Sequence, residues 1–229
     1  PVLIDIPKDL TDPKVKISFN YPKNVKIRSY SPAKNDNIDK IDSAAELLCS
    51  AKKPMIYSGG GIILGNAHIQ LKQLVKKLKY PITNTLMGLG GYPATDEKFL
   101  GMLGMHGTYE ANMAMHDCDV LLAIGARFDD RVTGDTSKFC PSAKIIHIDV
   151  DPSSISKIIE VDLSLVGETS KILKSLNLSL DKHLKKINQA ALKKWWKQIN
   201  KWREKNCLSY KKSKKIIKPQ SVIETLYDV

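Results

Sequence analysis

Two short runs of almost uninterrupted apolar residues, within Val120–Ile124 and Lys144–Asp149, constrain the fold of this chain more than any other feature. A strand with one solvated face alternates apolar and polar residues, so a continuous apolar run indicates a strand that is buried on both faces. Such strands belong to parallel sheets that helices cover on both sides. We therefore expect an α/β domain.

The same alternation of strand and helix extends over most of the chain. Further short apolar runs predict strands, and apolar residues spaced three and four apart predict one-sided helices between them. The expected strands are 54–58, 81–85 and 163–167, and the expected helices are 38–48, 67–78, 108–116 and 169–176. The pattern predicts one doubly wound, mainly parallel, Rossmann-like sheet within residues 35–178.

Glycines lie at the ends of several of the expected strands, at Gly59-Gly60-Gly61, in the segment Gly88–Gly91 and at Gly125. Ligands of doubly wound sheets bind at the carboxyl ends of the strands. Glycine there lets the backbone approach a phosphate or a flat ring. The triple glycine lacks the Gly-x-Gly-x-x-Gly spacing, and no helix is expected directly after it. A tight turn without a ligand is therefore an alternative.

Two polar segments are expected at the same edge. Gly104–Thr108 precedes a helix whose first amides can face an anion, although His106 can equally be a loop residue and Met105 a core residue. Gly125–Arg131 places two arginines and two aspartates after a buried strand, where charges are costly unless they are paired or bound to a ligand. Arginine suits a carboxylate or phosphate, and a surface ion-pair network is the alternative.

Acidic residues follow two further strands. Asp149 stands where the acidic residue of nucleotide-binding sheets accepts hydrogen bonds from a ribose, unless it only begins an Asp-Pro helix cap. Glu168 is either a second acceptor of this kind or an acid at a helix start.

The net charge of +12 raises the possibility of nucleic-acid binding, but much of the excess lies between Lys182 and Lys218. A solvated basic face explains such a run better. Trp195, Ile199 and Trp202 share one helical face, which favours packing over base stacking. We expect no specific nucleic-acid partner.

Cysteine usage and hydropathy place the chain in a reducing compartment away from membranes. No apolar stretch approaches the roughly 20 residues that span a bilayer. The cysteines contain no Cys-x-x-Cys pair, which suits a cytoplasmic protein better than a disulfide scaffold or a zinc site: Cys49, Cys118, Cys140 and Cys207.

Both ends of the chain look like parts of other units. Val2–Ile6 predicts a buried strand that stops at Pro7, and the prolines that follow, up to Pro32, indicate a linker. Lys211–Lys218 looks like a second linker, and a new helix is expected at Pro219. Because the chain also begins without methionine, we interpret it as an internal fragment.

Several of these segments together resemble one family. Gly101–Thr108 through Asn112, Gly125–Gly134 and His147–Asp151 resemble the central domain of the large catalytic subunits of acetolactate synthases, which depend on thiamine diphosphate. Pro1–Asp9 is similar to the end of the pyrimidine-binding domain of such enzymes, and the likeness extends through Trp195-Trp196 to Lys218-Pro219-Gln220.

The resemblance implies a transferase (carboligase) that condenses two 2-keto acids with loss of carbon dioxide. Two pyruvates would give 2-acetolactate, and pyruvate with 2-ketobutyrate would give 2-aceto-2-hydroxybutyrate, the first common step of valine, leucine and isoleucine biosynthesis. It further implies thiamine diphosphate, Mg²⁺, and FAD that undergoes no net redox change. The implied assembly is a homodimer or homotetramer, with a small regulatory subunit.

Carried over position by position, the resemblance implies FAD contacts at Gly59, Gly60, Gly61, Thr85, Leu86, Gly104, Met105, His106, Gly107, Gly125, Ala126, Arg127, Asp129, Arg131, Asp149, Val150 and Glu168. The family usually has aspartate at the last position, which puts that contact in doubt. Arg131 and Met105 would also bind the second keto acid, the first through its carboxylate and the second along its alkyl group. The Asp129-Asp130 pair would hold Arg131 in place.

The resemblance also divides the chain. It implies the end of the pyrimidine-binding domain at 1–10, a linker at 11–34, the FAD-binding domain at 35–178, a helical basic linker at 179–218, and the start of the diphosphate-binding domain at 219–229. The glutamate that activates thiamine and the Mg²⁺ ligands would lie elsewhere, so this segment contains no catalytic residue or metal site, and alone we expect it to be inactive. Alternatives are another FAD-containing thiamine enzyme, such as a pyruvate oxidase or glyoxylate carboligase, and a stand-alone nucleotide-binding or regulatory module.

Overall fold

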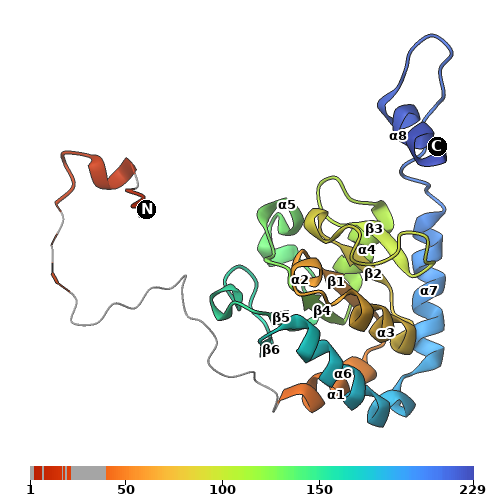
Figure 1. The fold of residues 1–229 in the computed structure, drawn as a ribbon, viewed down its shortest axis with the longest axis horizontal. Helices are drawn as coiled ribbons and strands as arrows, with labels where there is room; N and C mark the ends of the chain where they lie inside the picture. Colours follow the sequence, from red (N-terminus) through yellow and green to blue (C-terminus); the bar gives the residue numbers. More distant parts are fainter. Residues whose placement is uncertain (1–2, 7, 17, 19, 22–39) are drawn as a thin grey trace.

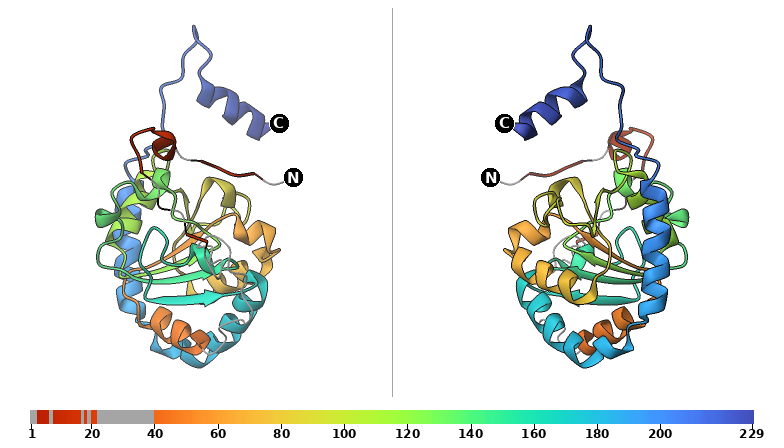
Figure 2. Two further views of the ribbon diagram at one scale, coloured as in Figure 1. Left: turned by 90° about the vertical axis from the view of Figure 1, so that its left-hand side faces the viewer. Right: turned by 90° about the vertical axis from the view of Figure 1, so that its right-hand side faces the viewer.

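The computed structural model describes residues 3–6, 8–16, 18, 20–21 and 40–229, and its main body is a six-stranded, all-parallel sheet between two groups of helices (Figures 1 and 2). The strand order is β3-β2-β1-β4-β5-β6, the order of a doubly wound sheet. The strands are β1 (Pro54–Ser58), β2 (Ile82–Asn84), β3 (Phe99–Met102), β4 (Val120–Ile124), β5 (Lys144–Asp149) and β6 (Leu163–Val166).

The central strands are buried on both faces, as their apolar runs predict. Every residue of β1 and β4 is buried, and so is every residue of β5 except Lys144. The register lines up one apolar row across five strands: Ile82, Ile56, Leu122, Ile146 and Leu163. The α/β expectation with a parallel sheet is therefore confirmed.

Two groups of helices flank the sheet. In the first group, α6 (Thr169–His183) packs against α1 (Ile41–Ser50) and α3 (His68–Leu78), and in the second, α7 (Gln189–Arg203) packs against α4 (Tyr109–Asp117). These helices agree with the apolar spacing, although α6 continues seven residues beyond the expected end at residue 176. A last helix, α8 (Pro219–Asp228), has no buried residue and follows α7 at the end of the chain.

Shorter elements complete the described chain. Two single-turn helices, α2 (Gly61–Leu64) and α5 (Asp130–Thr133), follow β1 and β4, and 3₁₀ turns lie at Lys8–Thr11, Leu86–Gly88, Thr136–Lys138, Pro152–Ser154 and Leu184–Lys186. Asp151 caps the turn at Pro152 by accepting a hydrogen bond from Ser153 N, as expected from the Asp-Pro pair.

The buried strand expected at Val2–Ile6 is wrong for the residues that the structure describes there. Residues 3–6 form no strand, and the side chains of Leu3 and Ile4 are 94% and 77% exposed. A strand needs a neighbour to complete its backbone hydrogen bonds, and none of the six paired strands lies beside this segment. Val2, Pro7, Ile38 and most of the expected linker at 11–34 lie outside the described residues.

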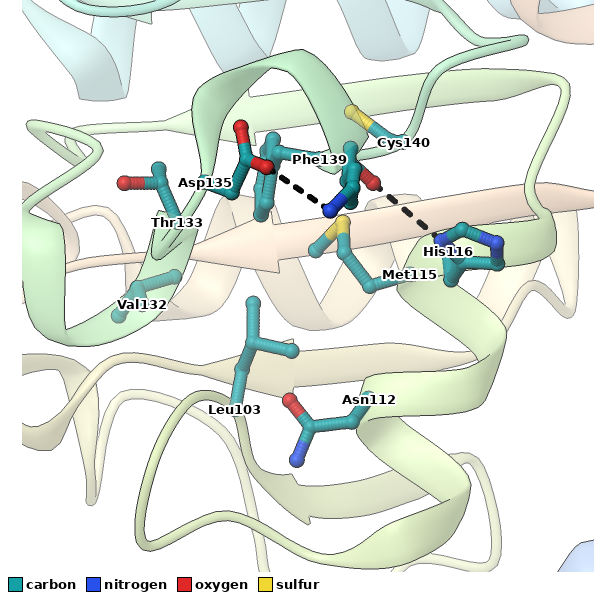
Figure 3. A pocket seen from close by; sticks show the side chains of 10 residues that line it. Leu103, Asn112, Met115, His116, Val132, Thr133, Asp135, Phe139 and Cys140 are labelled. Atoms are coloured by element: carbon teal, nitrogen blue, oxygen red, sulfur yellow. Dashed lines mark hydrogen bonds and ion pairs between the residues drawn. The ribbon is translucent and has the colours of Figure 1, made fainter.

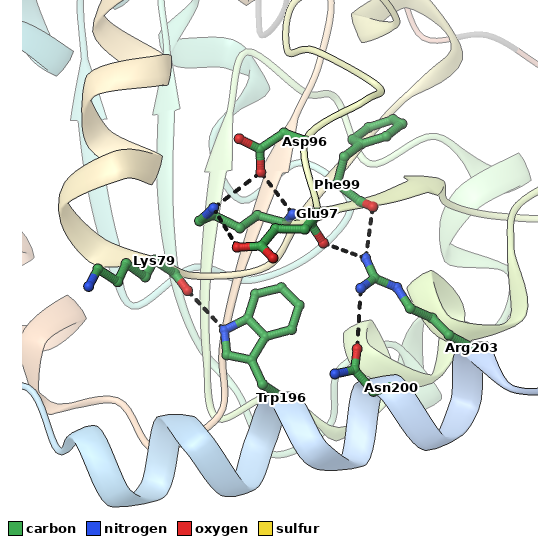
Figure 4. Close-up of polar contacts among 8 residues, drawn as sticks. Lys79, Asp96, Glu97, Phe99, Trp196, Asn200 and Arg203 are labelled. Carbon is green, nitrogen blue, oxygen red and sulfur yellow. Dashed lines mark hydrogen bonds and ion pairs between the residues drawn. The ribbon is translucent and has the colours of Figure 1, made fainter.

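Helix α7 is tied to the amino-terminal edge of the sheet by three side chains. The indole nitrogens of Trp195 and Trp196 donate to the carbonyl oxygens of Pro54 and Lys79 at 3.0 Å each. The Arg203 guanidinium donates to the carbonyl oxygens of Glu97 at 2.7 Å and of Phe99 at 3.0 Å (Figure 4). These carbonyls lie at the start of β1, before β2 and at the start of β3. One helix is therefore hydrogen-bonded to the amino-terminal ends of three strands.

The tryptophan face of α7 is a packing surface, as its spacing indicates. Trp195, Ile199 and Trp202 are buried, and the two indole rings meet edge to face with centroids 5.6 Å apart. Lys193, Lys197 and the other lysines on the opposite face are exposed. The aromatic side chains of this face are therefore occupied within the fold and offer no stacking platform.

We expect Arg203→Gln to lower the free energy of unfolding by about 1–3 kcal/mol, because the backbone carbonyls of Glu97 and Phe99 lose a charged donor. Urea denaturation of the protein measures this as a lower midpoint at an unchanged slope. Lys201→Gln, on the exposed face of the same helix, is the matched control and should change the midpoint little. Equal midpoints for the two variants would show that the hydrogen bonds from Arg203 do not stabilise the fold.

Three further observations bear on the class of protein. All four cysteines are free, and burial raises the pKa of Cys49 to about 11 and that of Cys140 to about 12. Within the described ranges, no helix has the length and apolar character that a membrane crossing requires. Nor do the described residues bring three or more histidine, cysteine or acidic side chains together around a possible metal position.

Candidate functional site

The carboxyl-terminal ends of the six strands form one edge, and the loops with the expected ligand contacts leave the sheet there. Strand register aligns Met102, Asn84, Ser58, Ile124 and Ile148 across five strands, so the segments that follow begin at a common level. The strand order reverses between β1 and β4, which is where doubly wound sheets bind their ligands.

At this reversal the loops after β1 and β4 touch through backbone atoms. Gly59 N donates to Ile124 O at 2.9 Å, and Gly61 N donates to Gly125 O at 3.1 Å. A Cβ on Gly59 would lie 2.2 Å from Gly125 O, and a Cβ on Gly61 would lie 2.6 Å from Gly125 Cα. Gly125 itself has φ +55°. These three positions therefore require glycine for close backbone approach, whether or not a ligand is bound.

Gly60 is different from its neighbours. Its dihedral angles, φ −58° and ψ −22°, suit any residue, and a Cβ would first meet the Met87 side chain at 3.2 Å. The expectation that no helix begins after the triple glycine is wrong, because α2 starts at Gly61. The single turn is too short to show an apolar period in the sequence. It is held by hydrogen bonds from Ile63 N and Leu64 N to Gly60 O, both at 3.0 Å.

The loop after β2 is fixed by a buried polar pair that the sequence did not single out. The Ser58 hydroxyl donates to Asn84 Oδ1, and Asn84 Nδ2 donates to Gly88 O at 2.9 Å. The Thr85 hydroxyl accepts from Gly88 N at 3.0 Å and closes the turn. Leu86 is the first residue of this turn, and its side chain is 68% exposed. The sequence signal for this pair was a polar residue at the end of each of two apolar strands.

The loop after β3 meets the loop after β4. Met105 N donates to Arg131 O at 3.0 Å, and a Cβ on Gly104 would lie 2.6 Å from the same oxygen. The structure thus brings together the backbones of the two residues that the resemblance assigns to the second keto acid. The Met105 side chain is 67% exposed, and His106 and Arg131 are exposed too. Gly107 lies within the same turn and donates to Gly104 O at 2.9 Å.

The charges of the Gly125–Arg131 segment pair differently from expectation. Arg127 Nη2 lies 3.0 Å from Asp129 Oδ2, with both side chains more than half exposed. Asp130 Oδ1 accepts from the backbone amide of Arg131 and not from its guanidinium. The Asp129-Asp130 pair therefore does not hold the Arg131 side chain, because Arg127, two residues before Asp129, reaches it instead. Among the described residues, no ion pair includes the Arg131 guanidinium, which stays available for an anion.

His147 shapes the β4 loop from the neighbouring strand, although sequence reasoning gave it no role. Its Nε2 lies 2.9 Å from Ala126 O, and its ring packs edge to face on Phe128 with centroids 5.1 Å apart. Both His147 and Phe128 are buried, and Phe128 adopts φ +57°. In the sequence, the only sign of this role is a polar ring within an otherwise apolar strand. The contacts of His147 hold Ala126 and Phe128 inward, so that Arg127 and Asp129 face outward.

The acidic candidates occupy different surroundings. Asp149 ends β5 and is 7% exposed; its Oδ1 accepts from Asp151 N at 2.9 Å, and its Oδ2 lies 3.7 Å from His147 Nε2. Val150 beside it is 64% exposed. Glu168 follows the outer strand β6, and hydrogen bonds from Lys171 and Ser170 hold its pKa below the ordinary value. Asp149 is therefore close to the β1–β4 reversal, whereas Glu168 is farther along the edge.

Of two cavities in the described structure, one borders this edge and the other lies at the opposite, amino-terminal edge of the sheet; neither includes the glycines of the loops. One of about 180 Å³ lies behind the β3 and β4 loops and is lined in part by Leu103, Asn112 and Val132 (Figure 3). Another of about 560 Å³ lies between α7 and the start of β1, lined in part by Lys53 and Trp195. The glycine loops of the candidate ligand edge therefore line neither of these two cavities.

Comparison with known proteins agrees with this architecture. Residues 41–176 match the model of the thiamine pyrophosphate enzyme, central domain. The chain is 48% identical over 228 residues to the acetolactate synthase large subunit of Haemophilus influenzae, covering 99% of this chain and 39% of that protein.

Further relatives have the same span. The acetolactate synthase isozyme 3 large subunit of Escherichia coli is 45% identical over 227 residues, which cover 99% of this chain and 40% of the relative. The large subunit of Buchnera aphidicola subsp. Schizaphis graminum is 47% identical over 227 residues, which cover 99% and 39%. The chain thus spans about two fifths of the length of the curated relatives it matches. Since the family model matches more than half of it, the chain belongs to the thiamine pyrophosphate enzyme family and contains the central domain of that family.

Proposed function

We propose that this chain is the central part of the large subunit of an acetolactate synthase. The observation that carries the proposal is identity of 45–48% to named acetolactate synthase large subunits along 99% of the chain. The reaction would join two pyruvates into 2-acetolactate and carbon dioxide, or pyruvate and 2-ketobutyrate into 2-aceto-2-hydroxybutyrate. This is the entry step to valine, leucine and isoleucine.

The loop edge would bind FAD. Gly60, the Thr85-Leu86 turn and Ala126 offer backbone where β1, β2 and β4 end, and exposed Leu86 and Val150 supply apolar surface for flat rings. Arg127 would face phosphate, buried Asp149 would accept from a ribose, and Arg131 would lie against FAD. The remaining proposed contacts are Gly59, Gly61, Gly104, Met105, His106, Gly107, Gly125, Asp129 and Glu168, of which Glu168 has the weakest support because it already pairs with Lys171.

Arg131 and Met105 would hold the second 2-keto acid. The contact between their backbones supports a shared position, because it brings a guanidinium and a flexible thioether side chain to one place on the edge. Arg131 would orient the carboxylate through two parallel N–H donors, and Met105 would line the alkyl group. Thiamine diphosphate, held with Mg²⁺ mainly outside this chain, would supply the electron sink for decarboxylation. The chain's own role would then be orientation.

The proposed organisation follows the same family. Residues 1–10 would end a pyrimidine-binding domain, 11–34 and 179–218 would be connecting segments, 35–178 would form the FAD-binding domain, and 219–229 would begin a diphosphate-binding domain. The intact protein would be a cytoplasmic homodimer or homotetramer, and a small regulatory subunit would bind it. The apolar side chains that α8 exposes support further packing there, because Ile223 and Leu226 are 67% and 70% exposed.

The experiment that tests the function uses the intact gene product. We expect it to be yellow, to release FAD on denaturation, and to form acetolactate from pyruvate when thiamine diphosphate and Mg²⁺ are present. The flavin absorbance should not bleach during anaerobic turnover, because no net electron transfer occurs. Protein that binds FAD but oxidises pyruvate to acetate would instead identify a pyruvate oxidase, and protein without flavin would refute the assigned edge.

A further inference from the structure

Asn112, on the first turns of α4, binds the turn that follows β3 through both ends of its side-chain amide. Its Oδ1 accepts from Gly104 N at 3.1 Å, and its Nδ2 donates to Gly104 O at 3.1 Å. The same Nδ2 donates to Thr108 O at 3.0 Å. Figure 3 shows Asn112 projecting from α4 toward Leu103, the residue before this turn. One side chain therefore bonds both backbone groups of Gly104, whose carbonyl oxygen also accepts from Gly107 N at 2.9 Å.

Gly104 is also confined from the opposite side. Its φ is +99°, and a Cβ there would lie 2.6 Å from Arg131 O and 3.1 Å from Val132 Cα. The next residue, Met105, donates its backbone amide to that same Arg131 oxygen at 3.0 Å. The turn is thus pressed against the β4 loop by contacts that depend on where Gly104 stands. Whatever holds Gly104 sets the separation between the Met105 and Arg131 backbones.

The helix that carries Asn112 is itself locked to the sheet. The Thr108 hydroxyl donates to Leu100 O of β3 and accepts from Ala111 N at 3.2 Å, which caps α4. The methyl group of Thr108 fits where Gly101 has no side chain, since a Cβ on Gly101 would lie 2.5 Å from Thr108 Cγ2. Asn112, one turn after Thr108, therefore has a fixed position relative to β3. Through its two hydrogen bonds to Gly104, it holds Gly104 at a fixed position as well.

The cavity of about 180 Å³ lies directly behind the turn, with Leu103, Asn112 and Val132 among its lining residues. Packed atoms resist displacement, whereas a neighbouring void leaves room for a loop to shift. Without the hydrogen bonds from Asn112, the turn would keep the backbone bond from Met105 N to Arg131 O but would be freer to shift beside this space. The Asn112 amide adds a restraint from the α4 side.

We propose that Asn112 is a positioning residue that fixes the spacing between Met105 and Arg131, and through it the placement of the second 2-keto acid. This inference rests on the proposed function of those two residues. Asn112 acts on the substrate only through the backbone of Gly104. Its loss should affect the step in which the second keto acid is joined and leave decarboxylation of the first largely intact.

Asn112→Asp tests the proposal in the intact, FAD- and thiamine-loaded protein. Aspartate keeps the size and the acceptor but removes the donor to Gly104 O and Thr108 O, and it faces both carbonyls with a carboxylate. We expect acetolactate formed per carbon dioxide released to fall about tenfold, as for the loss of one or two hydrogen bonds in the joining step. Hydrogen exchange should accelerate in peptides that cover Leu103–His106, while the flavin content stays unchanged.

Asn200→Asp is the matched control, because the exposed Asn200 of α7 serves Arg203 only as an acceptor, which aspartate preserves. It should alter neither product partition nor exchange. Asn112→Ser, which is too short to reach both groups of Gly104, provides a second test if the aspartate variant does not fold, and it should show the same pattern.

Unchanged partition and exchange in Asn112→Asp would overturn the proposal. Equal losses of carbon dioxide release and acetolactate, or loss of flavin, would also overturn it and make Asn112 a general structural residue. If the wild-type protein forms no acetolactate, the proposed function has failed; the exchange comparison then still decides whether Asn112 holds the Gly104–Met105 turn.

Discussion

Alanine at position 59 is expected to destabilise the protein by about 3 kcal/mol or more, the upper end of the cost of overpacking, because the new Cβ would lie 2.2 Å from Gly125 O and 2.8 Å from Ala126 Cα. Both neighbours are backbone atoms, which cannot rotate away as a side chain can. The expected result is a clearly lower melting temperature of the intact protein, accompanied by loss of bound flavin. The collision takes place where the loops after β1 and β4 meet.

Position 60 provides the matched comparison. Gly60 has helical dihedral angles, and its Cβ would lie 3.2 Å from Met87 Cβ in an exposed turn, so a shift of only a few tenths of an ångström relieves the contact. Gly60→Ala should therefore keep the wild-type melting temperature, and Gly60→Leu should keep the fold but lower flavin occupancy by covering the backbone. Melting temperature and flavin released per polypeptide measure the two effects separately. A wild-type melting temperature for Gly59→Ala would show that the loops can separate, and full flavin in Gly60→Leu would remove that glycine from the site.

Replacing Arg131 by lysine is expected to separate the two halves of the proposed reaction. Lysine keeps the charge but lacks the planar fork that binds a carboxylate through two parallel donors. Loss of one charge-assisted hydrogen bond costs about 1.5–3 kcal/mol, which is roughly ten- to a hundredfold in the rate of the step that needs it. The assay measures acetolactate formed per carbon dioxide released, and this ratio should fall while carbon dioxide release and flavin content persist.

Arg131→Ala extends this test, because free guanidinium ions in the buffer should partly restore acetolactate formation in the alanine variant if a guanidinium is what the carboxylate needs. Arg127 cannot take over the role without giving up its ion pair with Asp129. If Arg131→Lys lowers both products equally, or lowers neither while flavin stays bound, Arg131 positions the flavin or the loop and does not recognise the keto acid.

The parts of the fold that the sequence predicts are those with a continuous apolar run or a regular apolar spacing. β1 and β4 are buried along their whole length, so their apolar runs identified them. β3 escaped prediction because it is a half-buried edge strand that contains Gly101 at φ +89° and pairs with β2 across a register shift. α2 escaped because four residues cannot display a helical period. The apolar spacing of α7 predicted its buried face, but its hydrogen-bond partners on three strands depend on tertiary packing.

The candidate site divides in a similar way. Glycines at strand ends and the resemblance together identified its segments, since those features are local in sequence. The partners within the site were not predictable, because they depend on which loops approach. Asp129 pairs with Arg127, and Asn112 reaches back eight residues to Gly104, neither of which a spacing rule specifies. His147 was overlooked because a buried histidine in an apolar strand looks the same in sequence whether it shapes a loop or only fills the core.

The junction between the β1 and β4 loops is made of main chain alone, and this separates what keeps the sheet folded from what chooses its ligand. Gly59, Gly61 and Gly125 contact one another without contributing any side chain to the surface. For the ligand that we propose at this edge, selectivity would come from outward-facing neighbours such as Leu86, Met105 and Val150, whose side chains lie outside the junction. Substitutions of these outward-facing residues can therefore alter the surface without disturbing the three glycines, whose constraint is steric and independent of the chemistry performed.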